Sequence, residues 1–121
     1  MAGFLYVGAG GALGAALRYA ISLLPYKGSF PVLTFITNVI GAAAIGYIVG
    51  MAARRGADPK LILFLKTGVC GGFTTFSTFS LETYELFHRG HNQMAVIYMI
   101  FSMVFCLAGV SLGLYLAERM G

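Results

Sequence analysis

Four long apolar segments, separated by short polar turns, constrain the fold of this chain more than any other feature. They cover residues 4–24, 31–53, 61–87 and 94–117. Each is long enough to cross the hydrocarbon core of a bilayer, which takes roughly 20 residues in a helix. Only 10% of the 121 residues are charged, whereas about a quarter of a soluble domain is charged. We therefore expect an all-α membrane protein with four transmembrane helices in a single domain.

The third segment contains a stretch that differs from an ordinary membrane helix. Residues 68–80, Gly-Val-Cys-Gly-Gly-Phe-Thr-Thr-Phe-Ser-Thr-Phe-Ser, combine adjacent glycines with five hydroxyl side chains and three phenylalanines. Unpaired backbone groups are costly in lipid, so an irregular backbone survives only inside protein or beside a wet cavity. Glycine-interrupted membrane helices often build an ion or substrate site near the midplane. We predict that the third helix is broken near residues 70–75 and forms such a site.

The side chains of this stretch can bind a small ion without any fixed charge. Phe76 and Phe79 are three residues apart and share a helix face. An aromatic ring has a positive edge, so a small anion could lie against these rings while Ser77, Thr78 and Asn38 donate hydrogen bonds. Backbone carbonyls released by the break could instead coordinate a small cation such as Na⁺. Ordinary core packing is the alternative role for the phenylalanines.

Other polar residues inside the segments each allow two interpretations. Asn38 either joins two helices by hydrogen bonds or turns its amide toward a ligand. Arg18 either extends to the membrane surface or attracts anions to a pore mouth. Tyr98, Ser102 and Cys106 share one face of the fourth segment, which suggests a polar contact surface there.

Several functional classes are not expected from this sequence. The net charge of +4 comes from basic residues that flank the apolar segments without forming a patch, so no nucleic-acid partner is predicted. Cys70 and Cys106 both fall inside membrane segments, where a disulfide framework is not implied. No catalytic motif is present, and neither histidine has the partners that a metal site needs. We do not expect an enzyme.

The distribution of charge bears on orientation and assembly. Four crossings place both termini on one side, with five Lys or Arg residues on that side and three on the other. This weak bias permits insertion in both directions. Four short helices hardly enclose a polar path alone, and glycine-rich faces on the first two segments suggest a partner. We expect a dimer, and an antiparallel arrangement is physically plausible.

Three motifs together resemble a known family. They are Gly-Gly-Phe-Thr-Thr-Phe-Ser-Thr-Phe-Ser at 71–80, Gly-Ala-Leu-Gly-Ala-Ala-Leu-Arg-Tyr at 11–19, and Thr-Asn-Val-Ile-Gly at 37–41. With these motifs in the same order, nearly the whole chain resembles the Fluc (CrcB) fluoride channels. The resemblance implies an antiparallel, dual-topology homodimer with two pores, each built from both subunits. It also implies passive export of cytoplasmic fluoride across the plasma membrane.

The resemblance further implies roles for individual residues. The implied fluoride pore is lined by Asn38, Phe76, Ser77, Thr78, Phe79, Glu82, Tyr98 and Ser102. Arg18 matches an arginine of the pore vestibule. The backbone carbonyls of Gly71 and Thr74 match those that hold a structural Na⁺ at the dimer centre. Cys106 stands where relatives often carry a hydroxyl, and this weakens the polar track at that point.

Two other functions fit four short membrane helices. A small multidrug exporter couples protons to cationic drugs through a carboxylate inside the membrane, but the first segment contains no acidic residue. An assembly subunit without transport activity would explain the glycine faces but not the hydroxyl-rich stretch. Fluoride efflux from liposomes, with chloride as control, distinguishes these alternatives.

Overall fold

The computed structural model describes residues 2–120, and all the regular secondary structure in that range is helical. Four helical spans in it are long and apolar enough to cross a membrane, which confirms the prediction of an all-α protein with four such spans. The helices are α1 (Ala2–Ser22), α2 (Val32–Arg55), α3 (Pro59–Ile62), η1 (Leu63–Cys70), α4 (Gly71–Phe73), α5 (Phe76–His88) and α6 (Asn92–Met120). The third span comprises α3, η1, α4 and α5, and η1 has π-helical geometry.

Local chemistry fixes both ends of the third span. Asp58 precedes it as the N-cap, accepting a hydrogen bond from the Lys60 N–H at 2.9 Å, and Pro59 occupies the first helical position. Both choices suit a helix start, where the first N–H groups lack helical partners. At the far end, Gly90 adopts a positive φ of 83°, a conformation that favours glycine. The chain then turns directly into α6.

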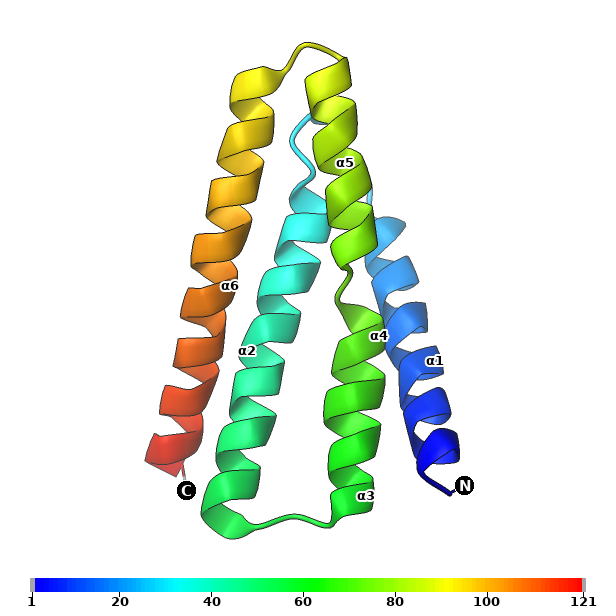
Figure 1. The fold of residues 1–121 in the computed structure, drawn as a ribbon, viewed down its shortest axis with the longest axis vertical. Helices are drawn as coiled ribbons and strands as arrows, with labels where there is room; N and C mark the ends of the chain where they lie inside the picture. The colour runs from blue at the N-terminus through cyan, green and yellow to red at the C-terminus, as the bar shows by residue number, and fades with distance from the viewer. Residues whose placement is uncertain (1, 121) are drawn as a thin grey trace.

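The helices associate as two tightly packed pairs. α1 lies along η1 and α4, and α2 lies along α6. Figure 1 shows α2 and the third span between the outer helices α1 and α6, with the start of α1 and the end of α6 at the same end of the bundle. This agrees with the expectation that both termini lie on one side.

Glycine residues allow the two helices of each pair to approach closely. A Cβ at Gly10 would meet the Phe64 carbonyl of η1, and a Cβ at Gly46 would meet the Val110 carbonyl of α6. Small residues allow such close approach between membrane helices. The sequence suggested that these faces receive a partner subunit, and that interpretation is wrong for these contacts. The faces are occupied within the chain because α1 and α2 each pack on a helix of the same protomer.

The third span is interrupted at Thr74 and Thr75, within the predicted range 70–75. Thr74 (φ −84°, ψ 157°) and Thr75 (φ −150°, ψ 118°) are extended, and α5 begins at the next residue. The adjacent glycines are helical and precede the interruption. Gly72 is needed for packing, since a Cβ there would meet the Gly11 carbonyl of α1. Gly72 therefore brings α4 close to α1, and the two threonines form the break.

Candidate functional site

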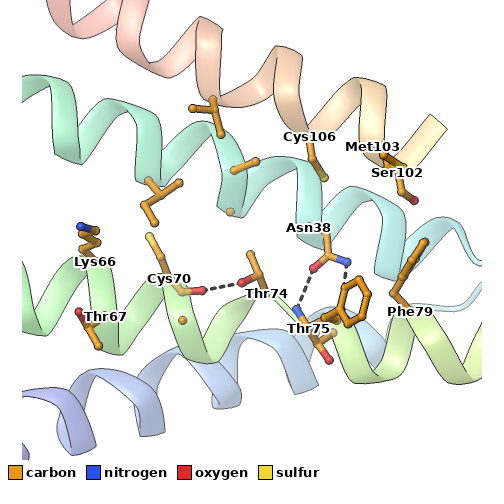
Figure 2. A pocket seen from close by; sticks show the side chains of 16 residues that line it. Asn38, Lys66, Thr67, Cys70, Thr74, Thr75, Phe79, Ser102, Met103 and Cys106 are labelled. Atoms are coloured by element: carbon orange, nitrogen blue, oxygen red, sulfur yellow. Dashed lines mark hydrogen bonds between the residues drawn. The ribbon is translucent and has the colours of Figure 1, made fainter. Parts of the chain in front are cut away.

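Asn38 on α2 holds the interruption open. The Thr75 N–H donates to Asn38 Oδ1 at 2.8 Å, and Asn38 Nδ2 donates to the Thr75 carbonyl at 3.2 Å, as Figure 2 shows. In a continuous helix the Thr75 N–H would bond to the Gly71 carbonyl four residues earlier. Asn38 thus replaces a helical bond with two bonds between helices. One of its two amide N–H groups is left for another acceptor.

The backbone carbonyls of residues 70–74, at and before the break, fall into two groups. Two have partners: Gly72 accepts from Arg18 Nε at 3.1 Å, and Cys70 keeps its helical bond from the Thr74 N–H and also accepts from the Thr74 hydroxyl. Within residues 2–120, no backbone hydrogen bond runs from α5 or the break to the carbonyls of Gly71 and Thr74. Free carbonyls in an unwound segment are the ligands that small cations take in membrane proteins. The donor set therefore fits the Na⁺ expected at these two residues.

The hydroxyl groups at the start of α5 form a helix cap. Thr75 Oγ1 accepts from the Thr78 N–H at 3.1 Å and donates to Thr78 Oγ1 at 3.1 Å. Ser77 Oγ lies 3.3 Å from Thr75 Oγ1. A threonine at this position satisfies N–H groups that lack helical partners. The hydroxyls of Thr78 and Ser77 are thus drawn together at the positive end of α5.

A cleft of about 640 Å³ lies between α2, the third span and α6. It brings together six residues that the sequence assigned to ion binding: Asn38, Gly71, Thr74, Phe76, Phe79 and Ser102. The Phe76 and Phe79 ring centroids are 5.7 Å apart at an interplanar angle of 43°. Phe76 is 79% exposed, so in the single chain its ring is open on most sides.

Ser102 is the unsatisfied polar group of this cleft. Its side chain is 7% exposed, and its Oγ has no hydrogen-bond partner among the described residues. Buried hydroxyls nearly always have a partner, so an orphaned one calls for an explanation. Cys106 lies one turn further along α6 and also lines the cleft. An ion in the cleft would give Ser102 its missing acceptor.

Glu82 and Tyr98 lie outside this cleft. The Tyr98 hydroxyl donates to Glu82 Oε1 at 2.8 Å, and the Thr34 hydroxyl donates to Glu82 Oε2 at 2.9 Å. The carboxylate lines a separate cavity of about 240 Å³ with Glu85 and Arg89. The Tyr98 ring, which is fully buried, packs on Phe79 with centroids 4.9 Å apart. Tyr98 therefore connects the Glu82 cavity to the aromatic wall of the cleft.

Arg18 and Thr78 line a third hollow, of about 130 Å³, together with Thr37 and Thr75. Arg18 is half-buried, and its Nε is committed to the Gly72 carbonyl. The predicted residues are thus divided among three neighbouring hollows around the break, except Ser77 and Tyr98, which line none of them. Among the residues that the structure describes, no group of three or more His, Cys, Asp and Glu side chains could hold a metal ion.

Comparison with known proteins identifies the family. Residues 5–114 match the family model described as "CrcB-like protein, Camphor Resistance (CrcB)". The chain belongs to the CrcB family.

CrcB relatives match nearly the whole chain. A protein of Ruminiclostridium cellulolyticum named "Fluoride-specific ion channel FluC" is 48% identical over 116 residues, which cover 93% of this chain and 89% of the relative. A protein of the same name from Methylobacterium sp. is 44% identical, covering 97% and 95%. "Fluoride-specific ion channel FluC 2" of Bacillus subtilis is 43% identical, covering 86% and 82%. These CrcB proteins are named as ion channels and not as enzymes.

Two residues of the site had no assigned role in the sequence analysis. Thr34 is one turn before Asn38 on α2 and donates to Glu82; its spacing of four residues from Asn38 was the available signal. Thr75 was noted only as a hydroxyl of the irregular stretch, yet it is both the cap of α5 and the partner of Asn38. Nothing local in the sequence distinguishes Thr75 from Thr74.

Proposed function

We propose that this CrcB protein is a fluoride-selective channel of the plasma membrane that exports cytoplasmic fluoride passively. The observation that carries the proposal is the interruption at Thr74 and Thr75, which concentrates neutral hydrogen-bond donors beside two aromatic rings. The relatives named as fluoride-specific channels support the choice of ion. HF crosses membranes as a neutral acid and ionises inside, and a passive anion path lets the trapped fluoride leave.

The cleft supports conduction by weak sites. Its described lining contains no Asp or Glu to repel an anion. The free N–H of Asn38, the orphaned hydroxyl of Ser102 and the edges of Phe76 and Phe79 are neutral donors available to a fluoride ion near the break. Conduction requires sites strong enough to admit an ion and weak enough to release it. Neutral donors satisfy both conditions.

The proposed pore is shared between two antiparallel copies of the chain. Phe76 supports this because a ring that is 79% exposed in one chain forms only part of a pore wall. The near balance of basic residues at the two ends supports insertion in both directions. Light scattering of the detergent-solubilised protein tests the dimer, with an expected protein mass of twice 12.9 kDa. A mass of one chain would contradict a shared pore.

We also propose a structural Na⁺ at the dimer centre, held by the carbonyls of Gly71 and Thr74 from both copies. The Gly71 carbonyl is supported as a ligand because the Thr75 N–H has been diverted to Asn38, and the Thr74 carbonyl because the Thr78 N–H bonds to Thr75 Oγ1. Backbone ligands suit a hard cation, which prefers oxygen donors. Replacing Na⁺ by N-methylglucamine throughout purification is expected to lower thermal stability in detergent, and Na⁺ is expected to restore it. Equal stability in the two cations would contradict the site.

Fluoride efflux from liposomes tests the function directly. Purified protein is reconstituted into vesicles loaded with potassium fluoride, efflux is started with valinomycin, and a fluoride electrode follows release. We expect rapid fluoride release and no chloride release from matched vesicles. Release of both anions would contradict the proposed selectivity for fluoride over chloride. Release of neither, with proton-driven uptake of a cationic dye instead, would favour a multidrug exporter.

A further inference from the structure

Lys66 is a cation of the third span to which the function described above gives no role. It lies on η1, seven residues after Pro59, which corresponds to roughly 10 Å of helix below the start of the span. The sequence alone suggests that such a lysine extends along the helix to the membrane surface. In the structure, however, Lys66 lines the same cleft as the phenylalanines and Ser102.

The cleft has two distinct ends. Figure 2 shows Lys66 and Thr67 at one end, Cys70, Thr74 and Thr75 along its length, and Phe79 with Ser102 at the other end. The end at Lys66 faces the water on the side where α1 begins and α6 ends, because η1 follows directly on the helix start at Pro59. Arg18 and the Glu82 cavity lie beyond the break, toward the opposite end of the bundle.

Lys66 is the one charged residue among the described residues that line the cleft. The lining is otherwise apolar or neutral, and it includes no carboxylate that could pair with an ammonium group. Lys66 is exposed in the single chain, and an ammonium group at the mouth of an apolar cleft attracts small anions from the water. At the opposite end of the same cleft, the orphaned Ser102 Oγ also lacks a polar partner. A fluoride ion that enters beside Lys66 and reaches Ser102 would satisfy both groups.

We infer that the Lys66 ammonium forms an anion site at the terminus-side mouth of the cleft, which raises the local fluoride concentration on that side before the ion reaches Ser102 and the phenylalanines. The inference rests on the proposed function and assigns the group that first attracts the ion on that side. Because the mouth is close to water, the ammonium stays partly hydrated, and its hold on fluoride is weak enough for release. In the antiparallel pair proposed above, each membrane face carries one such lysine.

Three variants test this role. Lys66→Met removes the charge and keeps most of the side-chain volume, Lys66→Arg keeps the charge, and Lys60→Met is the matched control. Lys60 is an exposed lysine of α3 that lines none of the three hollows. Initial efflux rates are measured in liposomes over a range of fluoride concentrations at low and high ionic strength. Gel filtration first confirms that each variant has the wild-type elution volume.

The site predicts a change in fluoride capture and not in the limiting rate. For Lys66→Met we expect the half-saturating fluoride concentration to rise by about tenfold at low ionic strength, the lower limit for charge-focused association. High salt reduces this difference because it screens the charge. Lys66→Arg and Lys60→Met stay close to wild type. A merely structural lysine would instead lower the limiting rate or the yield of folded protein.

The outcomes separate the inference from the function on which it rests. If the wild type releases fluoride and Lys66→Met has the wild-type half-saturating concentration, the site is overturned while the channel function stands. If Lys60→Met shifts that concentration as much as Lys66→Met, the effect belongs to overall charge, and the site is again overturned. If the wild type releases no fluoride, the channel function and this inference fail together.

Discussion

Arg18 donates its Nε–H to the carbonyl oxygen of Gly72 at 3.1 Å, between two residues that are 54 positions apart in the chain. The arginine thereby caps α4, the helix that ends just before the break. A half-buried guanidinium bound to a carbonyl that has lost its helical partner stabilises the interruption directly, since hydrogen bonds to charged groups contribute about 1.5–3 kcal/mol.

Replacing Arg18 by Met should therefore destabilise the protein by about 1.5–3 kcal/mol and lower fluoride efflux, because the Gly72 carbonyl is left unpaired inside the bundle. Thermal unfolding in detergent measures the first effect, and the liposome assay the second. Arg54→Met is the control, since Arg54 is exposed in the last turn of α2. Equal stability of the two variants would show that the bond to Gly72 contributes nothing.

Asn38→Asp separates the two hydrogen bonds of the asparagine. An aspartate still accepts from the Thr75 N–H but cannot donate to the Thr75 carbonyl, and it places a negative charge beside the cleft. We expect fluoride efflux to fall at least tenfold while stability falls by about 1–3 kcal/mol, the range for a buried group left without its partner. Asn92→Asp, at the exposed start of α6, is the control. Wild-type efflux in Asn38→Asp would exclude Asn38 from the path.

Tyr98 and Glu82 form a pair whose coupling can be measured. Tyr98→Phe removes the donor to Glu82 and keeps the ring that packs on Phe79. A double-mutant cycle with Glu82→Gln should give a coupling free energy of about 1.5–3 kcal/mol, as for a hydrogen bond to a carboxylate. Tyr84 lies on α5 with Glu82 and is exposed, so Tyr84→Phe should show no coupling to Glu82→Gln. A coupling near zero for Tyr98 would mean that the carboxylate is held by Thr34 and water.

Two glycines of α1 offer a matched pair. A Cβ at Gly10 would meet the Phe64 carbonyl, whereas a Cβ at Gly8 would have nothing within 4 Å. Gly10→Ala should cost about 1–3 kcal/mol through overpacking, and Gly8→Ala should be neutral or stabilising by up to about 1 kcal/mol through helix propensity. Thermal unfolding of both variants in one detergent measures the difference. Equal midpoints would contradict the packing of α1 on η1.

Phe76→Ile tests the aromatic wall. Isoleucine fills much of the same space but has no positive ring edge, so we expect efflux to fall strongly while the dimer and the thermal midpoint change little. Phe4→Ile is the control, because Phe4 is an exposed aromatic residue near the start of α1 and lines none of the three hollows. Unchanged efflux in Phe76→Ile would count heavily against a pore at this place.

The sequence predicted those features that depend on neighbouring residues. The four spans follow from hydropathy and length, and an interruption between residues 70 and 75 follows from the composition of 68–80. The donors of the cleft could be named because a cluster of hydroxyl and amide groups stands out against the apolar residues of a membrane span. These signals are local, so the sequence alone contains them.

Only the tertiary structure decided how the break is held and where each donor points. The bonds from Asn38 to Thr75 and from Arg18 to Gly72 join residues 37 and 54 positions apart, and they exist because α1 and α2 are rotated to face the third span. The same rotation directs the glycine faces inward. The rotations of the third span and α6 commit Glu82 to Tyr98 and place Lys66 on the cleft. Hydropathy fixes which segments cross the membrane, but it is nearly uniform around α2 and α6. The helix rotations are therefore set by close packing between the spans, and the glycine faces alone do not say which helix packs on them.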